Sequence, residues 1–275
     1  MIIPVFNEAD CIEKCLLSLR NQTFKPLEIL VVDDGSTDNS AEVSSALKAE
    51  VIRGVHKGPG TARNLGARSA KGNILVLVDA DMTFAPDYVA NLVEPIIKNC
   101  ALASCHWNEQ VANWENPWAR CETWFSGRED RRREPLEMPK HPYVYRAVRK
   151  DFFIESGGFS ENEGRGDDSS LARRTGVFSV IVPDATCYHR NVSGPGELFR
   201  EAVWRGRNVA VIKDHRLRRC VATMLIHQNP LISILHGMQL GISKREPRMP
   251  VYAAIFSAGM VLGILHALVS GNYQK

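Results

Sequence analysis

The chain has 275 residues, 44% of them apolar, and a formal net charge of +3. This length and composition suit one globular core with a small appendage, and they exclude a disordered chain and a repeat array. Residues 200–250 hold ten Lys or Arg, three Asp or Glu and no motif that reads nucleic acid, so we expect a membrane surface rather than nucleic acid as a partner.

Strands and helices alternate through the first hundred residues. Apolar runs predict four strands, at 1–5, 28–32, 51–55 and 74–78. Apolar residues at helical spacing predict a helix after the first strand, and Ser36 or Thr37 can cap a second helix. A third helix is predicted at 61–70, after the turn at Gly58 to Gly60. This alternation predicts an α/β domain with a mostly parallel central sheet.

The second half of the sequence is less regular. Residues 101–105 and 143–148 are predicted strands, and we expect long active-site loops or helices between them, at 107–142. The basic run at 131–133 in this stretch is flanked by acidic residues, which is typical of a self-neutralised surface. A further helix is predicted at 197–211.

Residues 251–269 carry no formal charge and would form a helix of about 28 Å, close to the thickness of a bilayer core. Lys244, Arg245 and Arg248 precede this segment, whereas Lys275 alone follows it. The positive-inside rule then places the large N-terminal part on the cytoplasmic face of the membrane. A buried helix of a soluble protein is the alternative.

Residues 220–243 are also uncharged, but Asn229 and Pro230 interrupt them. If this segment crossed the membrane as well, the basic residues that follow it would lie on the far side. We therefore expect an interfacial helix here. Gly259 and Gly263 would provide a small-residue face for helix packing in the next segment.

The seven cysteines are scattered and odd in number, which indicates a reduced, intracellular environment. Cys11 and Cys15 have helical spacing, but no second pair or histidines complete a zinc site. No basic segment with a cleavable apolar core begins the sequence, so we expect no secretion signal. The first predicted strand starts at Met1, as it would in a chain trimmed at its N-terminus.

Polar side chains follow three of the four N-terminal strands: Asn7 and Glu8, Asp33 and Asp34, and Asp79 and Asp81. In open α/β sheets, ligands bind at the carboxyl ends of the strands. Carboxylates gathered there repel one another unless a cation or a set of donors offsets their charge. A divalent metal ion with a diphosphate would do so.

Four segments carry a resemblance to a known family: Pro4-Val5-Phe6-Asn7-Glu8, Asp33-Asp34-Gly35-Ser36-Thr37-Asp38, Gly60-Thr61-Ala62-Arg63-Asn64 and Asp79-Ala80-Asp81. In this order and spacing they resemble the family 2 glycosyltransferases, which have the GT-A fold. The resemblance implies a GT-A catalytic domain at 1–208, with a nucleotide-binding half at 1–100 and an acceptor half at 101–208. Residues 209–275 would then form a membrane-associating region.

By this resemblance, the nucleotide of a nucleotide-diphosphate sugar would lie against the first three segments. Asp34 would accept a hydrogen bond from the base, Pro4 and Glu8 would line the base and ribose, and Arg63 would lie near the nucleotide. The acidic contact to the base suggests uridine, hence a UDP-sugar donor.

The resemblance also implies a Mg²⁺ or Mn²⁺ site. Asp79 would hold the ribose or a metal-bound water, and Asp81 would ligate the metal that bridges the two phosphates. His189 matches a position where many family members place a histidine near the metal, although a structural histidine is the alternative. Arg205 or Arg207 could clamp the diphosphate, and a solvated basic face near the membrane is the alternative.

Gly157-Gly158-Phe159, followed by Asp167 and Asp168, resembles the family's later motif, in which an acidic pair begins a helix. Asp168 falls on the position of the catalytic base. An inverting transfer needs one carboxylate to take the proton of the acceptor hydroxyl, and it needs no acid when a metal stabilises the leaving group. Asp167 stands where the family usually has Glu, which leaves its contact open.

The sequence therefore predicts a membrane-attached, inverting glycosyltransferase whose acceptor is a hydroxyl of a lipid-linked glycan or a polysaccharide. One alternative is a polyprenyl-phosphate sugar synthase, whose ionised acceptor needs no general base. Another is a non-catalytic membrane protein that binds nucleotide sugars. A nucleotidyltransferase is disfavoured, because no Gly-rich loop with a basic residue follows the first strand.

Overall fold

The computed structural model describes residues 1–25, 27–161, 167–209 and 229–270. The chain forms two compact units. The first unit comprises residues 1–110 and 134–189, and the second comprises residues 111–133 together with the described part of 190–275.

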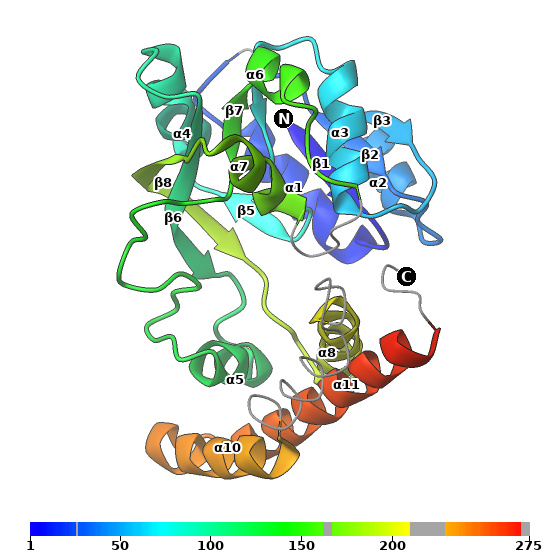
Figure 1. Ribbon diagram of the computed structural model, residues 1–275, viewed down its shortest axis with the longest axis vertical. Helices are drawn as coiled ribbons and strands as arrows, with labels where there is room; N and C mark the ends of the chain where they lie inside the picture. Colours follow the sequence, from blue (N-terminus) through cyan, green and yellow to red (C-terminus); the bar gives the residue numbers. More distant parts are fainter. Residues whose placement is uncertain (26, 162–166, 210–228, 271–275) are drawn as a thin grey trace. The chain divides into compact units, whose positions relative to one another are not determined.

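A parallel sheet opens the first unit (Figure 1). Its strands, in spatial order, are β1 (Ile2–Val5), β2 (Leu30–Asp33) and β3 (Glu50–Arg53). The helices that accompany them are α1 (Ala9–Arg20), α2 (Ser40–Ala46) and α3 (Pro59–Ser69). Both strand pairs are parallel, with Val5 opposite Asp33, so these strands end at one edge. The predicted strand and helix alternation is confirmed here.

A second sheet of the first unit contains antiparallel pairs. Its strands, in spatial order, are β4 (Ile74–Val76), β7 (Ala147–Arg149), β6 (Ala103–Val111), β8 (Val180–His189) and β5 (Met82–Phe84). β7 pairs antiparallel with β4 and β6, and β5 pairs antiparallel with β8. A parallel bridge from Ile2 to Leu77 connects the two sheets. The expectation of a mostly parallel sheet therefore holds for β1 to β3 and not for this second sheet.

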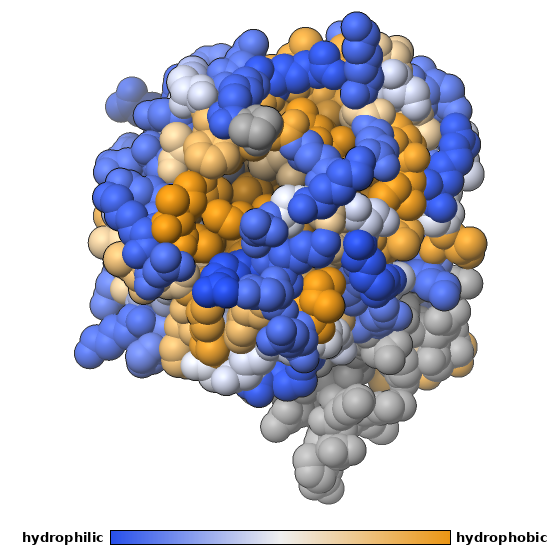
Figure 2. Space-filling model, turned by 90° about the horizontal axis from the view of Figure 1, so that it is seen from above, coloured by the Kyte–Doolittle hydropathy of each residue, from blue (hydrophilic) through white to orange (hydrophobic). Residues whose placement is uncertain are grey.

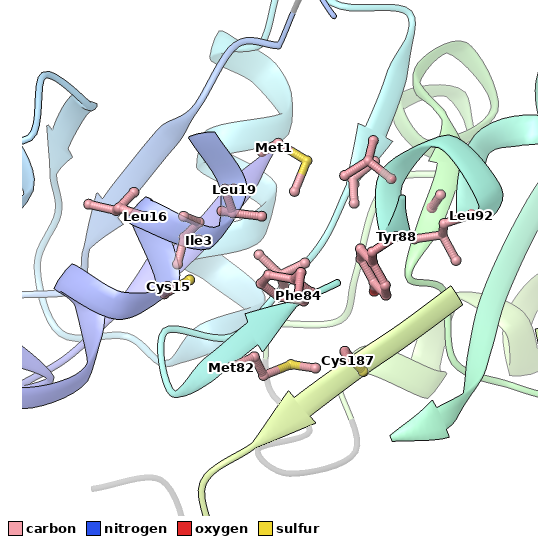
Figure 3. Close-up of a cluster of buried hydrophobic side chains, with 14 of the residues drawn as sticks. Met1, Ile3, Cys15, Leu16, Leu19, Met82, Phe84, Tyr88, Leu92 and Cys187 are labelled. Carbon is pink, nitrogen blue, oxygen red and sulfur yellow. The ribbon is translucent and has the colours of Figure 1, made fainter. Parts of the chain in front are cut away.

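Apolar side chains pack on both faces of these strands. The helices that cover the second sheet are α4 (Tyr88–Ile97), α6 (Lys150–Glu155) and α7 (Asp167–Thr175). Figure 3 shows Ile3 of β1 and Leu16 and Leu19 of α1 meeting Phe84 and Tyr88 in one core. A second core lies under α3, α6 and α7. Each fully buried Leu or Ile stabilises the fold by roughly 1.5–3 kcal/mol, so the two cores hold the strand ends in place.

Seen from above, the end of the first unit that carries α6 has a hollow where hydrophobic side chains gather inside a hydrophilic rim (Figure 2). A cavity of about 610 Å³ at this end is lined by Ile74, Ile96, Ile97 and Ile154, with polar residues that include Lys150. Ile74 begins β4, whereas the acidic pair follows the other end of this strand. The cavity is therefore separate from the predicted catalytic edge.

The second unit is helical. Its helices are α5 (Pro117–Phe125), α8 (Pro195–Val209), α10 (Pro230–Lys244) and α11 (Met249–Ser270). α8 lies along α11 in close contact, because a β-carbon on Gly259 would come within 2.6 Å of Ala202 and one on Gly263 would collide with the Val203 carbonyl oxygen. The predicted small-residue face of 251–269 thus packs on α8.

By packing, α5 and α8 belong with the C-terminal helices. The functional division predicted at residue 208 stays a prediction. Of the predicted interfacial segment 220–243, residues 220–228 lie outside the described residues. Among the residues that the structure describes, Met249–Val269 is the one span long and apolar enough to cross a membrane, and 44% of its most apolar stretch is buried inside the protein.

Candidate active site

The polar segments that follow β1 and β2 are tied together by hydrogen bonds. Asn7 adopts a positive φ of 56°. Its side-chain oxygen accepts hydrogen bonds from the Thr37 N–H at 2.8 Å and from the Asp38 N–H at 3.3 Å. The Glu8 N–H donates to Ser40 Oγ at 2.9 Å. Asn7 therefore joins the two loops, while Pro4 lies within β1 behind them.

The buried Asp34 carboxylate is held rigidly in the loop after β2. Its two oxygens accept hydrogen bonds from the backbone N–H groups of Lys57 and Gly58, at 2.9 and 2.8 Å. The Nδ1 atom of His56 lies 3.0 Å from Asp34 Oδ2, and the His56 ring stacks on Phe6 with ring centres 4.0 Å apart. Carboxylate oxygens have further lone pairs, so Asp34 can still accept a bond from a base. Sequence reasoning did not identify His56.

Asp79 lies between two arginines. Arg63 Nη2 donates to Asp79 Oδ1 at 2.5 Å, and Arg146 Nη1 donates to Asp79 Oδ2 at 3.1 Å. Burial would raise the pKa of the Asp79 carboxyl, but the charges of Arg146 and Arg63 outweigh it and hold that pKa well below its usual range. The two arginines therefore balance the negative charge of Asp79, which reduces its repulsion of the other carboxylates at the strand ends.

Arg146, which immediately precedes β7, was not identified from the sequence. Burial disfavours its charge, but Asp79 and Glu109 raise the pKa of the guanidinium above its ordinary value. The other five residues of the predicted strand 143–148 are apolar or aromatic, so no motif marks the arginine among them. Its interaction with Asp79 spans 67 positions of sequence.

Asp81 faces a histidine. The pairing of β5 with β8 sets Met82 opposite His189, which brings His189 Nε2 to 2.9 Å from Asp81 Oδ2. The other ring nitrogen, Nδ1, lies 2.6 Å from Glu109 Oε1. Glu109 is buried, and its second oxygen lies 3.1 Å from His106 Nε2. His189 is thus held between two carboxylates.

Asp168 lies in the first turn of α7, partly buried. It is close enough to Arg146 for its charge to help raise the pKa of that guanidinium. The preceding glycine motif is fixed by Asn64, whose side chain bonds both the N–H and the C=O of Phe159 at 2.9 Å. A β-carbon on Gly158 would come within 2.5 Å of Asn64, which explains a glycine there.

The donor atoms around Asp81 suit a divalent cation. Asp81 offers a carboxylate oxygen, and His189 offers a ring nitrogen whose partner nitrogen is bound by Glu109. Mg²⁺ and Mn²⁺ take carboxylate ligands, and imidazole also suits first-row metals. A carboxylate behind a ligating histidine is a common second contact in metal sites. Asp79, by contrast, already uses both oxygens on arginines.

The sequence profile described as glycosyl transferase family 2 matches residues 1–157, more than half of the chain. It covers the strand-end motifs and ends at Gly157, the first residue of the glycine motif. The chain belongs to glycosyl transferase family 2.

Curated relatives agree with this membership. Glycosyltransferase GlyA of Streptococcus pneumoniae is 37% identical over 103 residues, which cover 36% of this chain and 15% of the relative. Putative glycosyltransferase EpsH of Bacillus subtilis is 31% identical over 39% of this chain and 33% of the relative. Chondroitin synthase of Pasteurella multocida is 26% identical over 79% of this chain and 23% of the relative. The chain thus spans a third or less of the length of these relatives.

Solved structures confirm the predicted GT-A fold of this family 2 chain. Mannosyltransferase PcManGT from Pyrobaculum calidifontis, in complex with GDP-Man and Mn²⁺, superposes with a TM-score of 0.61 at 20% identity, covering 96% of this chain and 86% of that one. S. aureus TarS 1–349 in complex with UDP-GlcNAc has a TM-score of 0.55 at 16% identity, covering 100% of this chain and 92% of that one.

Two predicted contacts of the family 2 chain lie in its second unit. Arg205 binds Glu122 at 2.9 Å and also pairs with Glu201, so its charge is balanced there. Arg207 lies on the same helix. Their predicted contact with a diphosphate stays a prediction. The remaining candidates, from Pro4 to His189, all lie in the first unit.

Proposed function

We propose that this chain is a metal-dependent glycosyltransferase that moves a sugar from a nucleotide-diphosphate donor to an acceptor hydroxyl. The observation that carries the proposal is the 2.9 Å approach of His189 Nε2 to Asp81 Oδ2, beside the carboxyl edge of the sheet. Family membership supports the reaction class. Mn²⁺ and nucleotide sugars in structural neighbours support the cofactor and donor.

The donor would lie along the edge formed by the ends of β1, β2 and β4. Asp34 would accept a hydrogen bond from the base, with Pro4 and Glu8 beside the base and ribose. Uridine is proposed because a fixed carboxylate matches its ring N–H. Asp79, oriented by Arg63 and Arg146, would hold the ribose or a metal-bound water.

The metal would be held by Asp81 and His189, and it would supply positive charge to the departing diphosphate. Asp168 would take the proton of the acceptor hydroxyl as its oxygen attacks the anomeric carbon. The bond from this carbon to the diphosphate oxygen then breaks on the opposite face, which inverts the configuration. The positive charge of Arg146 acts on both Asp79 and Asp168, so it would offset the repulsion between the two carboxylates.

The acceptor would be a hydroxyl of a lipid-linked glycan or a polysaccharide, presented at the cytoplasmic face of a membrane. The apolar C-terminal helix supports attachment to a membrane. A polyprenyl-phosphate sugar synthase remains the alternative, because its acceptor would also come from the membrane.

A donor panel tests the proposal. UDP- and GDP-sugars are incubated with the protein and a glycan acceptor, with Mn²⁺ or with EDTA, and release of nucleotide diphosphate is measured. We expect turnover of a UDP-sugar that EDTA abolishes, and a loss of about 100-fold or more in Asp81→Asn. Undiminished turnover in EDTA, or in Asp81→Asn, would contradict the metal site. A lack of turnover with every donor would favour a non-catalytic binding protein.

A further inference from the structure

The second unit exposes apolar side chains along one side of each C-terminal helix. On α10, Leu231, Leu235, Met238 and Ile242 are exposed and recur at helical spacing. The opposite side of α10 packs on α11, where a β-carbon on Gly237 would come within 2.7 Å of Ala253. Beside the apolar stripe, α10 exposes a polar flank that includes Gln239 and Ser243. An apolar stripe next to a polar flank is typical of a helix lying in a membrane interface.

α11 has the same one-sided pattern over its whole length. Its exposed large apolar residues are Val251, Leu262, Leu265 and Val269, which lie within one narrow sector at 100° per residue. Between them, Tyr252, Met260 and Ile264 are buried in the protein. Although α11 is apolar all round, its other side packs inside the protein, so one side is left for lipid.

The buried side of α11 contacts charged groups. The Arg205 guanidinium lies 5.8 Å from the centre of the Phe256 ring, and it binds Glu122 and Glu201. Phe256 is seven residues into α11, about 10 Å along its axis. If α11 spanned a bilayer, this ion-pair cluster and α8 would be carried to a depth where charge is costly.

We infer that α10 and α11 lie on an anionic membrane surface, each with its exposed apolar side against the lipid, and that α11 does not span the bilayer. Lys244 and Arg245 end α10, and Arg248 immediately precedes α11. Lys244 pairs with Glu129 and Arg248 with Glu246, which leaves these five residues a net charge of +1 that favours anionic lipid headgroups. This inference rests on the proposed membrane attachment and not on the proposed chemistry. It replaces the spanning orientation expected from residues 251–269.

Vesicle flotation tests the surface. The full chain is mixed with phosphatidylcholine vesicles that contain either no anionic lipid or a third of phosphatidylglycerol. We expect binding that is stronger to the anionic vesicles, and a loss of at least about tenfold in the double variant Leu235→Glu and Met238→Glu. The control is Gln239→Glu, which adds a negative charge on the polar flank of the same helix. Its binding to vesicles should stay within about twofold of that of the wild type. Equal binding by the double variant, or no binding by the wild type, would overturn the inference.

Protease access decides between a surface and a spanning helix. The chain carries an epitope tag after Lys275 and is expressed in bacteria, from which sealed inside-out membrane vesicles are prepared. A surface helix leaves the tag on the same side as the first unit, so added protease removes both. A tag that survives until detergent is added would show that α11 spans the membrane. Neither experiment needs a donor sugar, so their failure is distinguishable from failure of the donor panel.

Discussion

Asp79 and Asp81 flank a single alanine, yet their carboxylates contact different kinds of side chain. Asp79 binds Arg63 and Arg146, whereas Asp81 faces His189. The first contact neutralises a carboxylate permanently, while the second sets a carboxylate oxygen beside a ring nitrogen, as a metal site requires. One short acidic motif therefore divides into an anion oriented by arginines and the proposed metal ligand.

Glu109 is expected to orient His189 for the metal, because it lies 2.6 Å from the nitrogen that faces away from Asp81. Glu109→Gln should weaken binding of Mn²⁺ by about 10–100-fold, as losses of such supporting carboxylates do. The measurement is the dissociation constant from the electron paramagnetic resonance signal of free Mn²⁺. Glu94→Gln, which removes an exposed partner of Lys98, is the matched control and should bind Mn²⁺ as the wild type does. Wild-type affinity in Glu109→Gln, with loss in His189→Ala, would show that Glu109 plays no part.

Asp168→Asn should separate proton transfer from donor binding. Loss of a general base typically slows the chemical step by about 10²–10⁴-fold, and the amide keeps the shape of the side chain. We expect that fall in kcat with an unchanged dissociation constant for the donor, measured by calorimetry. Asp151→Asn, at an exposed aspartate paired with Arg149, is the control. A rate close to that of the wild type would instead favour a phosphate acceptor.

At the scale of elements, the pairing of β5 with β8 does most to build the site. The three residues of β5 are too few to show a strand period, and β8 contains Pro183 and alternates irregularly between exposed and buried positions. Both strands therefore escaped prediction from the sequence. The strand Leu30–Asp33 was predicted, because a buried strand needs apolar side chains on both faces and its first three residues are apolar.

Contact between α8 and α11 depends on glycine. Gly263→Ala places a methyl group against the Val203 carbonyl, so it should destabilise the second unit by about 1–3 kcal/mol, although alanine normally favours a helix. Gly194→Ala, where no atom lies within 4 Å of the added carbon, should have little effect. Thermal unfolding in mild detergent measures both. Equal melting temperatures for the two variants would contradict this close packing.

Glu246 lies in the turn between α10 and α11, and its carboxylate pairs with Arg120 of α5. Burial would raise the pKa of its carboxyl, but Arg248 and Arg120 lower it below the ordinary value. Because the folded pKa lies below the unfolded one, this stabilisation is present above about pH 4.3 and is lost as the pH falls through the folded pKa.

Glu246→Gln should therefore cost about 1–3 kcal/mol at pH 7, and less as the pH falls below about 4. Chemical unfolding at several pH values measures the difference. Glu129→Gln, at an exposed glutamate that pairs with Lys244, should change stability little at any pH. A cost for Glu246→Gln that stays constant down to acid pH would show that the ion pairs do not contribute.

At the scale of the whole molecule, the candidates from Pro4 to His189 lie in the first unit, whereas Arg205, Arg207 and the exposed apolar residues of α10 and α11 lie in the second. The chain passes from one unit to the other after residues 110, 133 and 189. α5 and α8 pack on α11, while β8 and nearly all of β6 belong to the first unit. This division supports separate tests for chemistry and for membrane binding, because variants of one unit leave the other's contacts in place.

The sequence by itself determined the family, the N-terminal strands and the acidic candidates, because these depend on local apolar runs and on motifs at strand ends. Only the tertiary structure decided which groups those acids meet. Asp81 and His189 are 108 positions apart, and Asp79 and Arg146 are 67 apart, so strand pairing and not local sequence brings them together. For α11 too, the sequence and the fold gave different information, because its composition alone suits a bilayer span. Its buried side, packed on a charged helix, became evident only from the fold.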